Sequence, residues 1–489
     1  MSDGHVYPGG RVDRDDPRYD TLRRGFNLRW VGDPSEIAIC GDAEQVRGVV
    51  QEAVDRRLRI TVRSGGHCYE NFAVHNEGGI LVDMAPMNRV YYDTRRRAYC
   101  IEAGTTLWNA IWTLYKEYGR AIPSGSCYSV GAGGHVTGGG YGLLSRKYGL
   151  IVDHLTAVEM VHVTRDGRAE IVIAGKDGSD DERDLLWANQ GGGGGNFGIV
   201  TRFWFDDLPP APTEAYVVNL AWNWSDLDEN ELAQLIGAYG SFLEANSGVD
   251  SEYNGLFTLL HLTPKAASQI VLTAQYVGEA PKRLSDVTDF LYANGLRAPA
   301  VPQTHAIGRH YFPLGTMKIQ RLPWLYATQT LDGSGANQRG KYKSAYMKKA
   351  FPQPQIETIW KSLNDPFQNP QALLQVDSYG CRINSVASDA TAVPQRSSIM
   401  KLQYQTYWVH EEDTEANLRW INDFYVAMYG EAGPRPDDTM DGCYVNYPDV
   451  DLRDWEHLYY LENYPRLQRV KARWDPHDVF HHAQSIRLP

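Results

Sequence analysis

Two residues of this chain could form covalent bonds to a bound group. His67 ends the run RSGGH at residues 63–67, and Cys127 lies in the glycine-rich run at residues 125–135. Glycine has no Cβ, so backbone rich in glycine can approach a phosphate group or a flat ring closely. The sequence therefore predicts two nucleophilic side chains beside backbone that binds a cofactor.

The segments around these two loops have the periodicities of regular structure. Residues 44–56 are predicted to form a helix, and residues 58–63 a strand that ends in the Gly65-Gly66 turn. Apolar residues at helical spacing between 107 and 115 predict an amphipathic helix before the Cys127 loop. Further strands are predicted at residues 80–84 and 157–163, and a helix at 184–189 leads into the five glycines at 191–195.

The chain contains one clear signal for a domain boundary. A polar, proline-containing stretch at residues 206–212 has the composition of a linker. Beyond it, separated strands such as residues 215–220 alternate with helices, and the whole chain is long for a single core. We therefore predict an α+β fold with one domain at residues 1–208 and a second at residues 209–443.

The overall composition favours a small-molecule partner. The chain carries 48 lysine and arginine residues against 60 aspartate and glutamate residues, a net charge of −12 that opposes binding to nucleic acid or to an anionic membrane. It has no long apolar run and no signal-peptide pattern at its start, so we expect a cytoplasmic protein. Six cysteines without a Cys-x-x-Cys pair argue against a disulfide scaffold and against structural zinc, so we expect no metal.

Several ordered motifs extend the pattern over almost the whole chain. Besides the two loops, they are GGGYG at residues 138–142, the glycine-rich stretch at 191–200, YVNY at 444–447 and the segment at 463–486. In these motifs the chain resembles the flavoprotein oxidases of the berberine bridge enzyme type, in the vanillyl-alcohol oxidase superfamily. The resemblance implies a two-domain flavoprotein with a vanillyl-alcohol oxidase-type FAD-binding domain and an antiparallel-sheet substrate domain covered by helices. It also implies that residues 444–489 return to the FAD-binding domain.

The resemblance implies how FAD is held. In the family, the histidine of RSGGH bonds to the flavin 8α-methyl group and the cysteine of the C-x-x-V-G segment bonds to ring carbon 6, which assigns covalent attachment to His67 and Cys127. Cys68 lacks that context, and we expect it to be a small buried residue. The other residues expected to bind FAD are Arg63, Ser64, Gly65, Gly66, Val130, Gly131, Gly133, Gly134, His135, Gly138, Gly140, Tyr141, Gly142, Asn196, Gly198, Val200, Tyr444 and Asn446.

The glycines also partly mimic a dinucleotide-binding fingerprint. A Rossmann fold needs strand, loop, helix and a ribose-binding acid in register, and no such acid is well placed here. A nicotinamide dehydrogenase is therefore a remote alternative.

Tyr447 is the candidate base. A hydride leaves a carbinol carbon easily only when the hydroxyl proton departs, so the reaction needs a base near the flavin. Tyr447 matches the position that serves as base in tyrosine-using members of the family. A phenol with a pKa of ~10 is a poor base at neutral pH, so we expect its surroundings to lower that pKa. Neighbouring charge or hydrogen bonds could come from Asp377, Tyr379, Lys401 and Gln403.

Further residues are candidates for contact with substrate or base. Tyr141 resembles a family residue that contacts substrate, or else it packs on the adenine side. Asp377 invites comparison with the carboxylate that assists the tyrosine in carbohydrate oxidases of the family, or else it is a solvated strand-end carboxylate. It would share a strand face with Gln375 and Tyr379 if this run is extended. The berberine bridge type itself uses a glutamate on a later strand, and residues 401–405 contain none, which argues against carbon–carbon bond formation.

Val130 bears on which molecule accepts electrons from the reduced flavin. Its position resembles the one that controls oxygen access in the family, where valine leaves space for dioxygen. We therefore expect an oxidase that releases hydrogen peroxide and removes hydride from a hydroxyl-bearing carbon of a sugar or secondary metabolite, as bacterial antibiotic-tailoring members do. Oxidation or oxidative cyclisation of a non-sugar polyketide or alkaloid is the alternative, and a flavin-binding protein without turnover is a remote one. The predicted catalytic residues are Tyr447, Tyr141, Tyr379 and Asp377.

Overall fold

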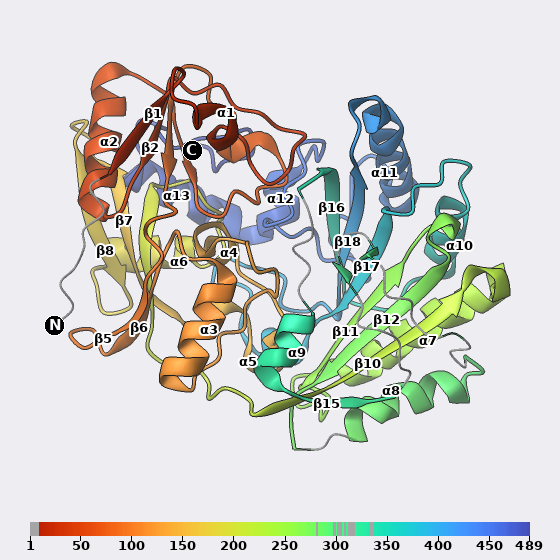
Figure 1. Cartoon of the computed structure of the whole chain (residues 1–489). Helices are drawn as coiled ribbons and strands as arrows, with labels where there is room; N and C mark the ends of the chain where they lie inside the picture. Colours follow the sequence, from red (N-terminus) through yellow and green to blue (C-terminus); the bar gives the residue numbers. More distant parts are fainter. Residues whose placement is uncertain are drawn as a thin grey trace.

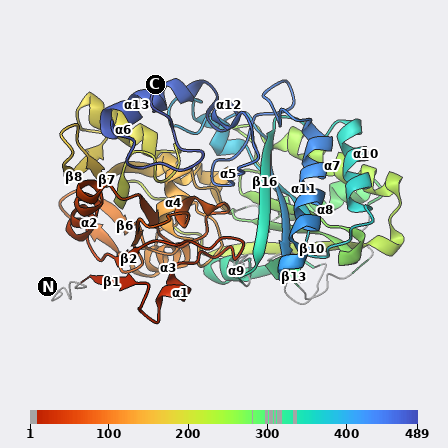
Figure 2. The same cartoon turned by 90° about the horizontal axis from the view of Figure 1, so that it is seen from above.

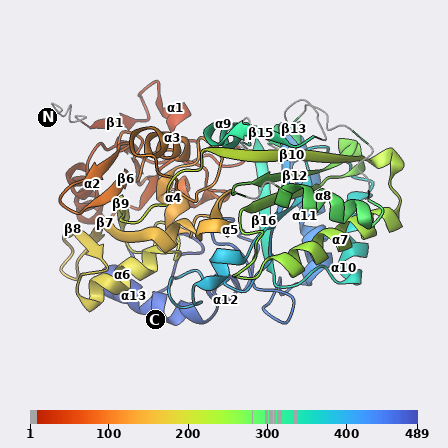
Figure 3. The same ribbon diagram turned by 90° about the horizontal axis from the view of Figure 1, so that it is seen from below.

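Two lobes lie side by side in the computed structural model, which describes residues 9–279, 282–296, 300, 306–307, 310–311, 318–331 and 337–489. The first lobe holds the beginning and the end of the chain, and the second holds the middle, as the colours of Figure 1 show. The views from above and below show the same two parts (Figures 2 and 3).

The first lobe contains two sheets. In the four-stranded sheet, of order β1-β2-β4-β3, the strands β2, β4 and β3 are parallel and β1 is antiparallel to β2. The five-stranded sheet, of order β5-β6-β9-β7-β8, is antiparallel. The strands are β1 (Gly10–Asp13), β2 (Glu36–Ile39), β3 (Ile60–Arg63), β4 (Ile80–Asp83), β5 (Val90–Asp93), β6 (Ala98–Glu102), β7 (Leu155–Val163), β8 (Ala169–Gly175) and β9 (Ile199–Phe205).

Two helices bring the chain to the predicted attachment loops. The first, α2 (Ala43–Arg56), begins at Asp42, whose side chain accepts a hydrogen bond from the Gln45 amide, and is followed by β3 and the Gly65-Gly66 turn. The second, α3 (Leu107–Tyr118), ends at Gly119, where φ is 63°. These elements confirm the helices and the strand predicted there. The other helices of this part are α1 (Tyr19–Leu22), α4 (Ala132–Thr137), α5 (Ser145–Tyr148) and α6 (Asp180–Asn189).

A seven-stranded antiparallel sheet forms the second lobe, with the order β15-β10-β12-β11-β17-β18-β16. Its strands are β10 (Glu214–Asn223), β11 (Leu256–Leu262), β12 (Gln269–Tyr276), β15 (Gln320–Pro323), β16 (Arg339–Met347), β17 (Leu373–Ser378) and β18 (Met400–Trp408), and β13 (Ala306–Ile307) pairs with β14 (His310–Tyr311) separately. The helices are α7 (Glu229–Asn246), α8 (Lys282–Ala293), α9 (Trp324–Thr330), α10 (Gln353–Leu363) and α11 (Thr414–Tyr429).

Helices cover one side of this sheet. The helices α7, α8, α10 and α11 lie on the side turned away from the first lobe (Figures 1 and 2). This arrangement confirms the predicted α+β fold with an antiparallel sheet covered by helices. Every residue of β18 is buried, yet Lys401, Gln403 and Gln405 alternate with Leu402 and Tyr404. Because successive side chains of a strand point to opposite faces, β18 has an apolar face and a polar face.

The end of the chain returns to the first lobe, where α12 (Trp455–Tyr460) and α13 (Tyr464–Trp474) lie (Figure 1). The fully buried Lys471 Nζ of α13 donates to the Asn196 carbonyl at 2.8 Å and to Asp475 at 2.7 Å, which fixes the helix beside the second glycine run. The chain passes from the first lobe to the second between the end of β9 at Phe205 and the start of β10 at Glu214. Among the described residues, no helix has both the length and the apolar character needed to cross a membrane.

Candidate active site

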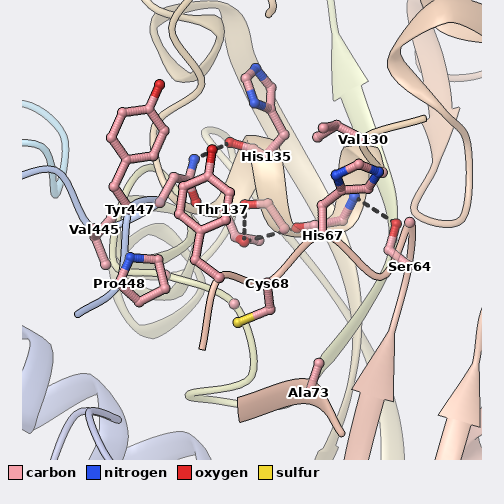
Figure 4. A pocket seen from close by; sticks show the side chains of 18 of the residues that line it. Ser64, His67, Cys68, Ala73, Val130, His135, Thr137, Val445, Tyr447 and Pro448 are labelled. Carbon is pink, nitrogen blue, oxygen red and sulfur yellow. Dashed lines mark hydrogen bonds between the residues drawn. The ribbon is translucent and has the colours of Figure 1, made fainter. Parts of the chain in front are cut away.

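A cavity of about 380 Å³ is lined by both lobes and by the C-terminal segment. Figure 4 shows His67, Val130, His135 and Tyr447 around one space, although they come from separate segments. Most of the residues predicted for the site line this cavity: Arg63, Ser64, Gly65, Gly66, His67, Cys127, Val130, Gly131, Gly133, Gly134, His135, Tyr141, Gly142, Asn196, Gly198, Val200, Asp377, Tyr444, Asn446 and Tyr447.

The two predicted attachment loops touch each other. Their backbones pack so closely at Gly65 and Gly131 that a Cβ on either glycine would collide with the other loop. Ser129 Oγ lies 2.9 Å from His67 Nε2, across 62 residues of sequence. The loops therefore form one unit, in which His67 and Cys127 both face the cavity.

Cys68 differs from the expectation that it is buried. Its side chain is only partly buried and lines the cavity beside His67. The surrounding protein raises the pKa of the Cys68 thiol to about 11, chiefly by burial. The thiol is therefore protonated at neutral pH and is a weak nucleophile.

Lys401 is the central charge next to Tyr447. The side chain of Lys401 is fully buried, and its Nζ lies 2.5 Å from Asp377 Oδ2 and donates a hydrogen bond to Tyr447 Oη at 3.0 Å. The ammonium also lies 4.4 Å from the ring centre of Tyr447 and 4.7 Å from that of Tyr141. A cation that donates to a phenol oxygen stabilises the phenolate form.

The pKa of Tyr447 nevertheless differs from the prediction. Burial, and then the negative charge of Asp377, hold the pKa of the Tyr447 phenol well above its ordinary value. The expectation that the surroundings lower this pKa is therefore wrong, because burial of the phenol and then the charge of Asp377 both raise it. Tyr447 is protonated at neutral pH in the protein alone.

A chain of hydrogen bonds on β17 and β18 points toward Asp377. Gln375 Nε2 donates to Asp377 Oδ1 at 2.7 Å, Gln405 Nε2 donates to Gln375 Oε1 at 3.4 Å, and Tyr407 Oη donates to Gln405 Oε1 at 2.5 Å. An ionised carboxylate can only accept, so it fixes the direction of each amide in turn. The chain holds the carboxylate of Asp377 in place as the partner of Lys401.

The cavity has an aromatic wall that was not predicted from the sequence. Tyr69 stacks on Tyr342 with ring centres 3.5 Å apart, and it lies 5.4 Å from the ring of Tyr447. Gln403 Nε2 donates to Tyr69 Oη at 2.9 Å. The signal that could have revealed the polar part of this wall is the alternation of polar residues along β18 from Lys401 to Tyr407.

A second group of charged residues consists of two buried lysines and three carboxylates. Lys341 Nζ lies 2.6 Å from Glu70 and 2.6 Å from Asp449, and Lys343 Nζ lies 2.7 Å from Asp449. Asp451, which is half-exposed, lies 3.0 Å from Lys341. We call these five residues the lysine–carboxylate cluster. It joins three segments that are far apart in the sequence.

The cluster adjoins the aromatic wall along the chain. Tyr69 precedes Glu70, Tyr342 follows Lys341, and Tyr447 lies two residues before Asp449. The ion pairs therefore fix the backbone that carries all three tyrosines.

The structure does not bring Tyr379 to the cavity. Strand β17 ends at Ser378, so Tyr379 lies beyond the strand face that carries Asp377. Its ring is fully buried, and its hydroxyl donates to the Gln395 carbonyl at 3.3 Å. The prediction of Tyr379 as a catalytic residue is therefore not supported.

Gly138 and Gly140 also lie outside the cavity lining. A Cβ on Gly138 would collide with the Asn446 side chain, and Gly140 has φ of +58° and packs against Ile151. These two glycines let neighbouring segments approach each other, and their contact with FAD stays a prediction.

His135 lines the cavity as a neutral imidazole. Burial, and then the charge of Lys401, lower the pKa of His135 to about 4. Its Nε2 accepts a hydrogen bond from the Gly125 amide at 3.2 Å, and its carbonyl accepts one from Asn446 Nδ2 at 3.0 Å. Within the described part of the chain, no group of three or more His, Cys, Asp or Glu residues is arranged to hold a metal.

Comparison with known proteins identifies the family. Residues 34–171 match the model of an FAD binding domain, and residues 443–487 match the model described as berberine and berberine like. The chain is 40% identical over 505 residues to the aclacinomycin-N/aclacinomycin-A oxidase of Streptomyces galilaeus, with 98% of this chain and 90% of that protein covered. The chain belongs to the berberine bridge enzyme-like family of FAD-linked oxidoreductases.

Further relatives are similar to this chain over nearly their whole length. The chain is 37% identical to the hexose oxidase of Chondrus crispus, with 98% of this chain and 94% of that protein covered. A solved structure of a glycopeptide hexose oxidase complexed with teicoplanin aligns with a TM-score of 0.90 and 34% identity, covering 98% of this chain and 99% of that one.

The residues of the cavity fit FAD, the cofactor that this family of oxidoreductases uses. A Cβ on Gly134 or Gly195 would meet no protein atom within 4 Å, although both residues line the cavity, so their backbone faces open space. Backbone without side chains suits close contact with a pyrophosphate and a flat ring. His67 and Cys127 supply the two nucleophiles beside that backbone.

Proposed function

We propose that this protein is a bicovalent FAD-dependent oxidase that removes hydride from a hydroxyl-bearing carbon and releases hydrogen peroxide. The observation that carries the proposal is the juxtaposition in one cavity of His67 and Cys127 with Tyr447, whose hydroxyl accepts a hydrogen bond from the buried Lys401 behind it. Two attachment points lie on one wall, and a phenol paired with a buried ammonium lies on the polar wall. FAD, when bound, accepts the hydride and passes two electrons to dioxygen.

Tyr447 receives the hydroxyl proton of the substrate. Only its phenolate form can accept that proton, and Lys401 Nζ donates the hydrogen bond that stabilises this form. Asp377 holds Lys401 in place from the other side. Because the pKa of Tyr447 is raised, the ionised fraction is small at neutral pH and grows about tenfold for each unit of pH.

The polar face of the sheet binds the substrate. Gln403 and Gln405 reach the cavity with amide groups, and Tyr141 and Tyr407 reach it with aromatic rings. Amides and aromatic rings together suit a sugar, which presents both hydroxyls and apolar C–H faces. The names of two relatives, a hexose oxidase and a glycopeptide hexose oxidase, also support a sugar as the substrate.

Val130 leaves room for dioxygen beside the flavin. It lines the cavity in the same loop as Cys127, and its side chain is small. Access of dioxygen to the reduced flavin distinguishes an oxidase from a dehydrogenase, and we assign that role to the space at Val130.

A substrate panel tests the proposal. Purified protein is incubated with D-glucose, lactose, a glycosylated aromatic polyketide, a glycopeptide antibiotic, and the matching aglycones and simple alcohols, and peroxide and carbonyl product are both measured. We expect equal amounts of peroxide and carbonyl product with at least one sugar-bearing compound. Turnover confined to the aglycones would move the substrate class to non-sugar metabolites, and the absence of peroxide with every compound would contradict the proposed oxidase.

A further inference from the structure

His67 is held on two sides by residues of other segments. Its Nε2 lies 2.9 Å from Ser129 Oγ, in the loop that carries Cys127. The ring of Phe26 stacks on the imidazole with centres 3.9 Å apart and planes inclined by 22°. The Phe26 amide donates to the Gly66 carbonyl at 2.8 Å, so the stacking partner is itself fixed to the loop. These contacts fix both the plane and the rotation of the imidazole ring.

The loop that carries Ser129 is equally fixed. A Cβ on Gly65 would collide with the Ser129 carbonyl and the Gly131 amide, so the two backbones are in direct contact there. Ser64 Oγ donates to the Ala103 carbonyl at 2.6 Å and accepts from the Gly133 amide at 3.3 Å, which adds a hydrogen-bonded link between the loops. Ser129 thus meets His67 from a rigid support.

We infer that Ser129 is the positioning residue for covalent attachment of FAD at His67. A neutral imidazole carries one N–H and one nitrogen with a lone pair, and the Ser129 hydroxyl can pair with Nε2 in either tautomer. Attachment uses the tautomer in which Ser129 Oγ accepts from Nε2–H, because the lone pair then belongs to Nδ1, which becomes the nucleophile. The inference rests on the proposed function, because it requires that FAD is attached to His67.

The attachment balances with dioxygen as the oxidant. Nδ1 forms a bond to the carbon of the flavin ring methyl group, and that carbon gives up one C–H bond. Two electrons and two protons, one from the methyl group and one from the imidazole, convert dioxygen to hydrogen peroxide. Bond formation at Nδ1 puts positive charge on the ring until the Nε2 proton leaves, and Ser129 Oγ stabilises this charge by accepting the Nε2–H hydrogen bond.

The role of Ser129 is specific to one of the two attachments. The hydrogen bond reaches His67, whereas Cys127 belongs to the same loop as Ser129 and has its own place in the cavity lining. Loss of the Ser129 hydroxyl is therefore expected to affect the histidine bond alone. A loss at His67 alone would therefore distinguish a positioning role of Ser129 from a general loss of structure.

The test compares two side chains of the same shape at position 129. The full-length Ser129→Thr and Ser129→Val variants differ only by a hydroxyl in place of a methyl group, and Ser129→Ala removes the hydroxyl without adding bulk. Each protein, expressed with FAD, is denatured, freed of unbound flavin and digested, and mass spectrometry measures flavin on the His67 and Cys127 peptides. We expect wild type and Ser129→Thr to carry flavin on both residues.

In Ser129→Val and Ser129→Ala, we expect early flavin occupancy at His67 to fall about fivefold, the effect of losing one hydrogen bond of about 1 kcal/mol, with occupancy at Cys127 unchanged. Equal occupancy of His67 in all four proteins would overturn the inference, and so would a parallel loss at both residues. Wild-type protein without flavin on either residue would instead contradict the proposed function itself.

Discussion

Lys401 and Lys341 lie on neighbouring strands of one sheet and are both almost fully buried, but they have different partners. Among the described residues, the ion-pair partners of Lys341 are Glu70 and Asp449, each at 2.6 Å, and the half-exposed Asp451 at 3.0 Å. Burial opposes the charge on Lys341, yet these carboxylates raise its pKa. A lysine with such partners serves only to hold segments together.

Lys401 has one carboxylate and one phenol as partners. Asp377 balances the charge of Lys401, and Lys401 Nζ donates a hydrogen bond to Tyr447 Oη. The protein places the two kinds of site within one sheet, so that the lysine–carboxylate cluster fixes the backbone of Tyr447 and Lys401 acts on its hydroxyl. The partner, and not burial, therefore decides whether a buried lysine has a structural or a chemical role.

Removing the phenol is expected to have the largest effect on the chemical site. Tyr447→Phe removes the group that accepts the substrate proton but keeps the ring beside Lys401. We expect kcat to fall about 10²- to 10⁴-fold, the usual contribution of a general base. Peroxide release, normalised to bound flavin, measures this change. A loss of less than about tenfold would mean that another group takes the proton.

Removing the ammonium is expected to shift the pH dependence. Lys401→Met deletes a charge-assisted hydrogen bond of about 1.5–3 kcal/mol to the phenolate, so kcat/KM at neutral pH should fall roughly 10- to 100-fold. In wild type the pKa of Tyr447 is already raised, so kcat/KM should rise with pH and level off only under alkaline conditions.

The variant should need a still higher pH to reach its plateau, because the phenol loses its cation. A pH profile of kcat/KM in both proteins tests the shift. A variant profile parallel to that of wild type would show that Lys401 does not act on the ionisation of Tyr447.

Breaking the lysine–carboxylate cluster is expected to affect stability. Asp449→Asn leaves two buried lysines without a full partner and should cost about 3–5 kcal/mol in the free energy of unfolding. Asp451→Asn is the matched control, because Asp451 is half-exposed and should contribute only about 0–1 kcal/mol. Urea unfolding measures both. Equal effects of the two substitutions would contradict the structural role of Asp449.

The same cluster makes a prediction about acid. Burial alone would raise the pKa of Asp449, but Lys341 and Lys343 outweigh it and lower the pKa. A carboxylate with a lowered folded-state pKa stabilises the protein above its ordinary pKa of ~3.9, and this stabilisation is lost as the pH falls through the lowered value. The stability difference between wild type and Asp449→Asn should therefore shrink in strong acid, as urea unfolding at several pH values would show.

Tyr379→Phe is expected to have the smallest effect. Its hydroxyl donates to a buried carbonyl away from the cavity, so its loss should cost about 0.5–1.5 kcal/mol of stability and leave kcat within about twofold. Thermal unfolding and peroxide release measure the two quantities. A large loss of kcat in a stable variant would restore Tyr379 to the site.

The sequence predicted the part of the site that is built from backbone. RSGGH, the Cys127 loop and the glycine runs have local patterns, and most of their residues line the cavity. Helical and strand periodicity likewise predicted α2, α3 and β3 around these loops. Tyr447 was predicted from its motif, since nothing in its own neighbours distinguishes it from the other tyrosines.

The sequence could not predict what depends on contacts between distant segments. The pairing of Tyr69 with Tyr342 and of Glu70 with Lys341 joins residues more than 270 positions apart. The end of β17 at Ser378 was decided by strand pairing with β18, and this placed Tyr379 outside the cavity. The raised pKa of Tyr447 was missed because burial and the charge of Asp377 are properties of the folded protein.

The most direct test of the proposed oxidase follows the flavin itself. Purified protein is mixed, without dioxygen, with the best compound of the substrate panel and with its analogue lacking the reacting hydroxyl, and the visible absorbance of the flavin is recorded. We expect bleaching by the hydroxyl compound alone, followed by recovery of the colour and one peroxide per flavin when dioxygen is admitted. Protein that stays oxidised with every alcohol, or that bleaches but is not reoxidised by dioxygen, would contradict the proposed oxidase.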